Sequence, residues 1–301
     1  MAAKPKLRIG LIGSGFMGKA HVFGFATAQK VFDLPMQIDL HTVADINDEA
    51  AARAAHEFGF SNATSDWREM LANPEIDVID ITAPNALHKE MALEAIAAGK
   101  HVYCEKPLAP LAVDAAEMAD AAEAAGVKTQ VGFNYLCNPM LGLAKEMIAN
   151  GELGEIRGYR GLHAEDYMAN ADDPYTFRHD PAGGGALADL GSHALATAEF
   201  LLGPITRVMG DCVTSISERP DGQGGRRAIE VDAIDGVHRG RTVLRSDQAG
   251  PRQLSGDGPG SNTEKGMAGN PNEPMAQTRA IGVRSVQKPT DCKWAGSGSN
   301  L

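Results

Sequence analysis

Five short apolar runs, separated by helical stretches, constrain the fold of this chain more than any other feature of its sequence. The runs are residues 7–12, 38–45, 76–82, 100–105 and 127–133. Amphipathic, alanine-rich stretches such as 47–58, 86–98 and 110–125 lie between them. Apolar strands that alternate with helices indicate a parallel sheet covered on both faces. We therefore predict an α/β fold with a doubly wound parallel sheet over residues 5–134.

The first turn of this pattern carries glycines at a spacing that suits a bound phosphate. Gly13, Gly15 and Gly18 form a GxGxxG directly after the first apolar run, with Phe16 and Met17 between the last two. The first glycine allows a tight turn, the second lets the backbone approach a pyrophosphate, and the third permits close packing of helix on strand. The helix N-terminus favours the anion. The context predicts a Rossmann-type dinucleotide-binding domain, and a plain strand-to-helix turn is the alternative.

Asp45 ends the second apolar run, 27 residues after Gly18. A carboxylate at this position accepts hydrogen bonds from the adenosine ribose hydroxyls and repels a 2′-phosphate. Its neighbours in the sequence are Ile46 and Asn47 rather than Arg or Lys. We therefore predict NAD as the cofactor, with NADP less favoured. A role for Asp45 as a helix N-cap is the alternative.

Polar side chains follow the next two runs, at the sheet edge where ligands bind in open α/β folds. Asn85 and His88 follow the third run, and Lys106 follows the fourth, between Glu105 and Pro107. A lysine in such a crevice can take part in acid–base chemistry. Considered one at a time, Asn85 could cap a helix, His88 could lie on the surface, and Lys106 could form a surface pair with Glu105.

After residue 134 the pattern changes to a mixture of helices and strands. Helices are expected at 139–150 and 187–202, strands at 156–167 and 205–217, and a loop at 174–185. We predict an α+β domain over residues 135–235. Asp189 and His193 are spaced i,i+4, so on a helix both lie on one face, where the carboxylate can orient the imidazole as a proton acceptor. An ordinary helix-surface pair is the alternative.

Composition excludes several classes of protein. The net charge of −11 argues against nucleic acid as a partner, because phosphate binding needs clustered positive charge. The four cysteines are scattered without a CxxC pair, which predicts a reduced, cytoplasmic protein with no metal site. No apolar run approaches the ~20 residues that a membrane helix needs, and residues 7–12 are too short for a signal-peptide core.

Residues 236–301 differ from the rest of the chain. They carry nine basic and five acidic side chains, and only eight residues are Leu, Ile, Val or Phe. Too little apolar surface is available there to build a core. We predict an irregular tail that is disordered or results from a shift of reading frame near residue 235. A disordered basic tail that binds a partner is the alternative, and reading the other two frames of the gene beyond codon 235 tests the frameshift.

Taken together, these segments resemble the glucose–fructose oxidoreductase / inositol dehydrogenase (Gfo/Idh/MocA) family. The matching segments are GSGFMG (13–18), TAPNALH (82–88), CEKP (104–107), VGFNY (131–135), GELGEI (151–156) and GGGALADLGSH (183–193). The resemblance covers residues 5–235, and the ordered set is far more specific than any one segment. It implies an NAD-dependent dehydrogenase that acts on a sugar, cyclitol or related polyol, often as a homo-oligomer.

The resemblance also implies roles for the residues. His193 would be the proton acceptor, Asp189 would orient it and contact the substrate, and Lys106 would hydrogen-bond the reacting oxygen. The cofactor's nicotinamide half would be lined by Asn85, His88 and Glu105. Its adenosine half would be held by Gly13, Gly15, Gly18 and Asp45, and Phe16 and Met17 would also bind the cofactor.

The sequence departs from the family pattern at three places. Leu136 and Cys137 replace the usual Arg and Phe after VGFNY, and Ala196 replaces a frequent Asp three residues after the histidine. The later strands of the second domain, which form the usual oligomer interface, do not appear after residue 235, so that domain is expected to be truncated and oligomerisation is in doubt. A nucleotide-binding protein without turnover, such as a sensor or an inactive truncated product, is the alternative function.

Overall fold

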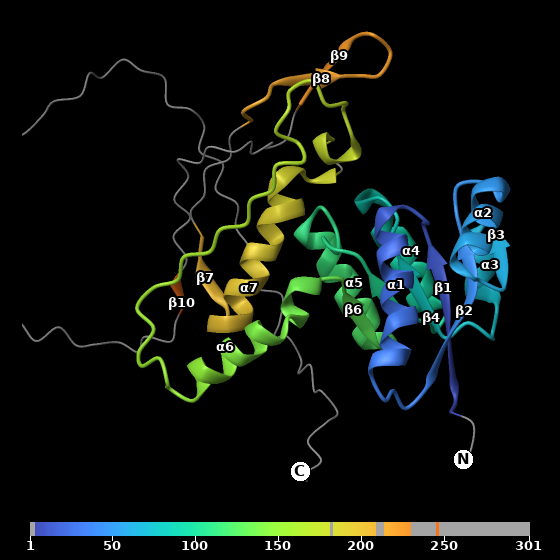
Figure 1. The fold of residues 1–301 in the computed structure, drawn as a ribbon, viewed down its shortest axis with the longest axis horizontal. Helices are drawn as coiled ribbons and strands as arrows, with labels where there is room; N and C mark the ends of the chain where they lie inside the picture. The colour runs from blue at the N-terminus through green and yellow to red at the C-terminus, as the bar shows by residue number, and fades with distance from the viewer. Residues whose placement is uncertain (1–3, 181–182, 209–213, 230–244, 247–301) are drawn as a thin grey trace, which may run out of the picture. The chain divides into compact units, whose positions relative to one another are not determined.

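A six-stranded parallel sheet forms the centre of the first part of the chain (Figure 1). The computed structural model describes residues 4–180, 183–208 and 214–229, together with the backbone of 245–246. The strand order is β3-β2-β1-β4-β5-β6, and every neighbouring pair is parallel. The strands are β1 (Lys6–Ile12), β2 (Gln37–Ala44), β3 (Asn62–Thr64), β4 (Val78–Ile81), β5 (His101–Cys104) and β6 (Thr129–Val131). The predicted doubly wound Rossmann sheet is therefore confirmed.

Helices cover both faces of this sheet because successive strand side chains point to opposite faces. Leu11 packs with Val22 and Ala54 in one apolar cluster, on the side of α1 (Phe16–Val31) and α2 (Asp48–Phe58). The neighbouring Ile12 belongs to a second cluster on the opposite face. That cluster includes side chains from α3 (Trp67–Ala72), α4 (His88–Ala97) and α5 (Ala112–Ala125).

Strand β3 was not expected from the sequence. It contains only three residues, Asn62–Thr64, and none of them is buried. The apolar periodicity that identified the other five strands is therefore missing. Pairing with β2 alone places β3 at the edge of the sheet.

The second part of the chain mixes helices with short strands, as predicted for an α+β domain. The helices are α6 (Pro139–Ala149) and α7 (Ser192–Leu202), and a π-helical turn (Leu187–Gly191) precedes α7. Strands β8 (Glu218–Pro220) and β9 (Arg226–Ala228) form an antiparallel hairpin. The side chain of Arg219 is fully buried and donates to the carbonyl oxygens of Met168 and Asn170, which ties the hairpin to the preceding loop.

The strand predicted at 156–167 is wrong, because these residues contain no strand. Strand β7 (Ile205–Arg207) forms the start of the strand expected at 205–217, and residues 209–213 of that prediction lie outside the described residues. An apolar run becomes a strand only where another strand supplies backbone partners, and none lies beside 156–167 in the described part of the chain. Helix α6 likewise has no buried residue, and its Met140 and Leu143 are exposed.

The chain divides into two compact units. The first comprises residues 1–201 and 212–238, and the second comprises 202–211 and 239–301. In the second unit, β7 pairs antiparallel with β10 (Arg245–Ser246). Apart from these two residues, the predicted tail at 236–301 lies outside the described residues. Within the ranges that are described, no helix is long and apolar enough to cross a membrane.

Candidate active site

The glycine-rich loop has the backbone geometry that a dinucleotide needs. Gly13 has a φ of +94°, a conformation that a side chain disfavours. A Cβ at Gly18 would lie 2.3 Å from the carbonyl oxygen of Gly13, so helix α1 can approach the loop only with glycine there. A Cβ at Gly15 would meet no atom within 4 Å, which leaves open space above the helix N-terminus. These three features fit a pyrophosphate held against backbone N–H groups.

Phe16 and Met17 follow this open position at the start of α1. Phe16 is exposed and Met17 is half-buried. The first turn of α1, from Phe16 to Lys19, carries no acidic side chain to repel an anion.

Asp45 lies beside the glycine-rich loop, at the end of β2. Its carboxylate accepts the backbone N–H of Ser14 at 2.9 Å and also the Ser14 hydroxyl. Partial burial opposes ionisation, but the hydrogen bonds from Ser14 and from the Ile46 N–H outweigh it and lower the pKa of Asp45. A negative charge is therefore held where a ribose would reach the end of β2. The N-cap of α2 is Asn47, not Asp45.

Asn85 and His88, which follow β4, form hydrogen bonds with other loops of the chain. The Asn85 side-chain amide donates to the carbonyl oxygen of Gly183 at 2.8 Å, which joins the loop after β4 to the segment that leads into α7. His88 is fully buried, and its ring nitrogens contact the carbonyl oxygens of Pro107 and Ala83 at 2.9 Å each. The alternative of a surface histidine is therefore wrong. The predicted contacts of both residues with the nicotinamide half remain predictions.

Lys106 and Asp189 form an ion pair although 83 residues separate them in the sequence. The ammonium Nζ of Lys106 lies 2.6 Å from Oδ1 of Asp189 and 3.0 Å from its backbone carbonyl oxygen. The side chains are only 15% and 10% exposed, which makes this a largely buried pair. The alternative of a surface pair between Lys106 and Glu105 is wrong, because Glu105 is buried and turns to other partners.

Asp189 also binds two further groups that sequence reasoning did not identify. Its Oδ2 accepts the hydroxyl of Tyr167 at 2.5 Å and Nε of Arg178 at 2.8 Å. Burial alone would raise the pKa of Asp189, but hydrogen bonds from Lys106 and Tyr167 and the charges of Lys106 and Arg178 bring it to about 2. Tyr167 lies in an irregular segment and Arg178 lies in a short 3-10 helix (Phe177–His179), and neither belongs to a motif, so only the fold reveals them.

The π-helical turn places Asp189 at the start of α7, and His193 follows in the first turn of the α-helix. No hydrogen bond joins the two residues in the described structure. The orienting role of Asp189 stays a prediction, and the direct contact that would carry it is missing among the described residues. The physical reason is competition, because two cations and a phenol hydroxyl occupy the carboxylate.

His193 instead lies among aromatic rings. The His163 ring stacks on it at 5.2 Å between centroids, and Phe133 and Tyr135 contact it edge-on. Its Nδ1 atom is buried and has no hydrogen-bond partner. Burial, followed by the charge of Lys106, lowers the pKa of His193 to about 4. The ring is therefore neutral at pH 7 and can accept a proton.

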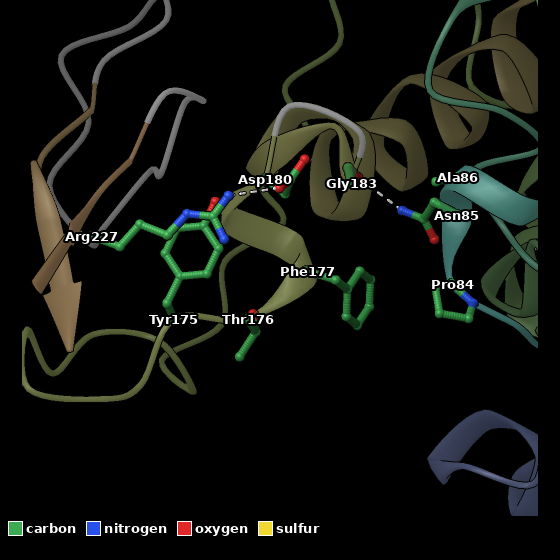
Figure 2. A pocket seen from close by; sticks show the side chains of 9 residues that line it. All are labelled: Pro84, Asn85, Ala86, Tyr175, Thr176, Phe177, Asp180, Gly183 and Arg227. Carbon is green, nitrogen blue, oxygen red and sulfur yellow. Dashed lines mark hydrogen bonds and ion pairs between the residues drawn. The ribbon is translucent and has the colours of Figure 1, made fainter. Parts of the chain in front are cut away.

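A cavity of 420 Å³ adjoins this region on the side of Asn85 (Figure 2). Arg227 closes one end, where its guanidinium lies 4.1 Å from the Tyr175 ring centroid and 3.1 Å from the Asp180 carboxylate. The lining residues are Pro84, Asn85, Ala86, Tyr175, Thr176, Phe177, Asp180, Gly183 and Arg227. Lys106, Asp189 and His193 are not among them, so the ion pair lies outside the lining of this cavity.

Comparison with protein families agrees with this geometry. The NAD-binding Rossmann-fold model of the GFO/IDH/MocA oxidoreductases matches residues 7–133, and a model of their C-terminal domain matches residues 142–238. The fold and the site thus define an oxidoreductase with an NAD-binding Rossmann domain. The chain belongs to the GFO/IDH/MocA family, and the expected resemblance is confirmed.

Individual proteins and solved structures are also similar to this chain. Levoglucosan dehydrogenase of Pseudarthrobacter phenanthrenivorans is 41% identical over 229 residues, which are 74% of this chain and 58% of that protein. An NAD-binding oxidoreductase from Klebsiella pneumoniae has a TM-score of 0.72 and 46% identity, with 75% of this chain and 61% of that chain covered. Levoglucosan dehydrogenase in complex with NADH and levoglucosan has a TM-score of 0.73 and 40% identity, with the same coverage. The chain spans about three fifths of the length of these relatives.

Proposed function

We propose that this protein is an NAD-dependent dehydrogenase that acts on a carbinol of a sugar, cyclitol or related polyol. The observation that carries the proposal is the buried contact between Lys106 and Asp189, with His193 one turn further along the same helical segment. Residues from the nucleotide-binding domain and from the second domain thus meet at one place. Neither member of such a pair would be buried for stability alone, because desolvation of two charges is costly.

Each of the three residues has a chemical role in this proposal. Asp189 and its carbonyl oxygen use two of the three N–H donors of Lys106, so one donor is left for the oxygen of the substrate. The neutral ring of His193 accepts the proton of the substrate hydroxyl during oxidation and returns it during reduction. Bound NAD supplies the nicotinamide carbon that accepts or donates hydride.

The preference for NAD over NADP rests on Asp45. Its carboxylate is ionised and fixed beside the glycine-rich loop, where a 2′-phosphate would meet a like charge. The relative solved with levoglucosan binds NADH, which supports the same assignment. A reduced cytoplasmic location is consistent with the free thiols of Cys104 and Cys137, and it remains part of the proposal.

The substrate class is proposed from the similarity to levoglucosan dehydrogenase and from the groups around the ion pair. Tyr167, Arg178 and His163 surround Asp189 and His193 with donors that suit a polyhydroxylated ring. Their contacts with Asp189 and His193 make them candidates for contact with hydroxyl groups that do not react.

The test is turnover by the purified 301-residue chain. NAD is mixed with levoglucosan, myo-inositol and a panel of other polyols, and the absorbance of reduced nicotinamide is followed. We expect turnover on at least one compound, and we expect Lys106→Ala and His193→Ala to abolish it while NAD affinity stays within about threefold. Loss of NAD affinity in these variants would contradict the assigned roles.

A nucleotide-binding protein without turnover is the second candidate. It is favoured by the exposed apolar face of α6. Exposed apolar surface of this kind predicts poor solubility and weak substrate binding. Tight NAD binding with no turnover on any polyol would support this function instead.

A further inference from the structure

A buried histidine lies between two carboxylates beneath the loop that carries Lys106. Nδ1 of His21 contacts the two carboxylate oxygens of Asp80 at 2.9 and 3.0 Å, and Nε2 contacts Oε1 of Glu105 at 2.9 Å. The three side chains are at most 7% exposed. None of these contacts is used by the chemistry proposed above.

Strand alternation explains why charged groups gather here. In β4, Ile79 and Ile81 point into the apolar cluster on the α4 and α5 face, so Asp80 between them points to the α1 face. Its side chain therefore meets His21 of α1. The ring of Tyr103 from β5 stacks on the imidazole at 4.7 Å and closes the site from the side.

With Asp80 and Glu105 both ionised, the geometry requires a charged imidazole. A carboxylate oxygen accepts hydrogen bonds, and a neutral imidazole has only one N–H to donate. Contacts from both ring nitrogens to carboxylates are all satisfied by an imidazolium. Burial lowers the pKa of His21, but hydrogen bonds and charges from Asp80 and Glu105 outweigh burial and raise the pKa to about 9.

Glu105, which is held by His21, also contacts the backbone of Lys106. Its second oxygen, Oε2, accepts the backbone N–H of Lys106 at 3.1 Å. On the other side, a Cβ at Gly132 would lie 2.5 Å from Oε1, so that glycine packs directly against the carboxylate. The carboxylate is therefore held between the imidazole, the peptide of Lys106 and the β6 end of the sheet.

We propose that His21 is a positioning residue that, as an imidazolium paired with Asp80, holds Glu105 and through it the backbone of Lys106, so that the ammonium group reaches Asp189. This inference rests on the proposed function for its effect on turnover. The chain of contacts runs from helix α1 of the nucleotide site to the ion pair of the second domain. Asp80 anchors His21 and does not itself contact Lys106.

The first measurement uses NMR on the wild-type protein and does not depend on activity. The ring carbons and nitrogens of His21 are assigned by comparison with His21→Gln. We expect the shifts of an imidazolium from pH 6 to pH 8, and we expect the Lys106 amide resonance to move in both His21→Gln and Glu105→Gln. A neutral His21 ring at pH 7, or an unmoved Lys106 amide, overturns the proposal.

The second measurement uses kinetics. We expect His21→Gln to lower kcat by 10- to 100-fold, with the dissociation constant of NAD changed less than threefold. The matched control is His56→Gln, because His56 lies exposed on α2 and should keep wild-type kcat. An unchanged kcat in a folded His21→Gln protein overturns the proposal. Absence of turnover in the wild type would contradict the dehydrogenase function instead, and the NMR result would still decide the role of His21.

Discussion

Nζ of Lys106 and Oδ1 of Asp189 lie 2.6 Å apart, and the same ammonium also donates to the backbone carbonyl of Asp189. Lys106 follows a strand of the nucleotide-binding domain, and Asp189 lies in the π-helical turn before α7. The pair therefore links the two parts of the site. A π-helical turn at such a position is a frequent feature of functional sites.

The energetic weight of this pair can be measured by a double-mutant cycle. We expect Lys106→Met and Asp189→Asn each to lower the free energy of unfolding by about 2–4 kcal/mol, because each removes one member of a largely buried ion pair. The double variant should lose at least about 1 kcal/mol less than the sum of the two. Urea unfolding of the four proteins measures this coupling.

The exposed pair of Lys19 and Glu57 provides the control for that cycle. Both side chains are about half exposed, so solvent screens their attraction and their coupling should be close to zero. Equal coupling in the two cycles would show that the Lys106–Asp189 contact is not special to the site.

The stability of the protein should depend on His193 at acidic pH. Folding lowers the pKa of His193 from 6.5 to about 4. Above pH 6.5 the histidine is neutral in both the folded and the unfolded chain, and the free energy of unfolding is at its full value. As the pH falls from 6.5 towards 4, the unfolded chain binds the proton more readily than the folded one, so the free energy of unfolding decreases. About 3 kcal/mol should be lost across this window.

Thermal or urea unfolding between pH 7 and 4 measures the effect, with His193→Asn as the comparison. The variant should show a shallower decline of stability with falling pH than the wild type. His56→Asn, at an exposed position, should keep the wild-type slope. A His193→Asn slope as steep as that of the wild type would contradict the lowered pKa.

Two glycines of the nucleotide loop should separate folding from cofactor binding. Gly18→Ala places a Cβ 2.3 Å from the Gly13 carbonyl oxygen and should destabilise the protein by about 1–3 kcal/mol. Gly15→Ala meets open space and should leave the melting temperature unchanged. It should nevertheless weaken NAD binding at least tenfold, because the methyl group occupies the approach of the pyrophosphate.

Calorimetry of unfolding and of NAD binding checks both glycine variants. Wild-type NAD affinity in Gly15→Ala would place the pyrophosphate elsewhere. An unaltered melting temperature in Gly18→Ala would show that α1 can move away from the loop.

Asp45 should set the choice between the two cofactors. We expect Asp45→Ser to weaken NAD binding about tenfold, because hydrogen bonds to the ribose hydroxyls are lost, and to strengthen NADP binding, because a repelling charge is removed. Fluorescence titration with NADH and NADPH measures the ratio. Asp48→Asn removes an equal charge at an exposed position three residues away and should leave the ratio unchanged.

Local pattern was enough to predict the nucleotide-binding domain. The apolar runs that form β1, β2, β4, β5 and β6 are long enough to define a parallel sheet. The GxGxxG motif indicates a nucleotide site because it directly follows β1. Strand β3 was missed because its three residues carry no apolar signal. Residues 156–167 have the apolar character of a strand, but strand formation depends on a partner strand that the sequence does not show.

The sequence by itself determined the Rossmann fold, the family and the identity of the residues at the candidate site, because periodicity and ordered motifs are local properties of the chain. Only the tertiary structure decided how those residues are paired. Asp189 binds Lys106, Tyr167 and Arg178 rather than His193, and Glu105 binds His21 rather than Lys106 Nζ. The pairing of these side chains depends on which charged groups are buried together away from water. Residues far apart in the chain are brought into one buried site only by folding.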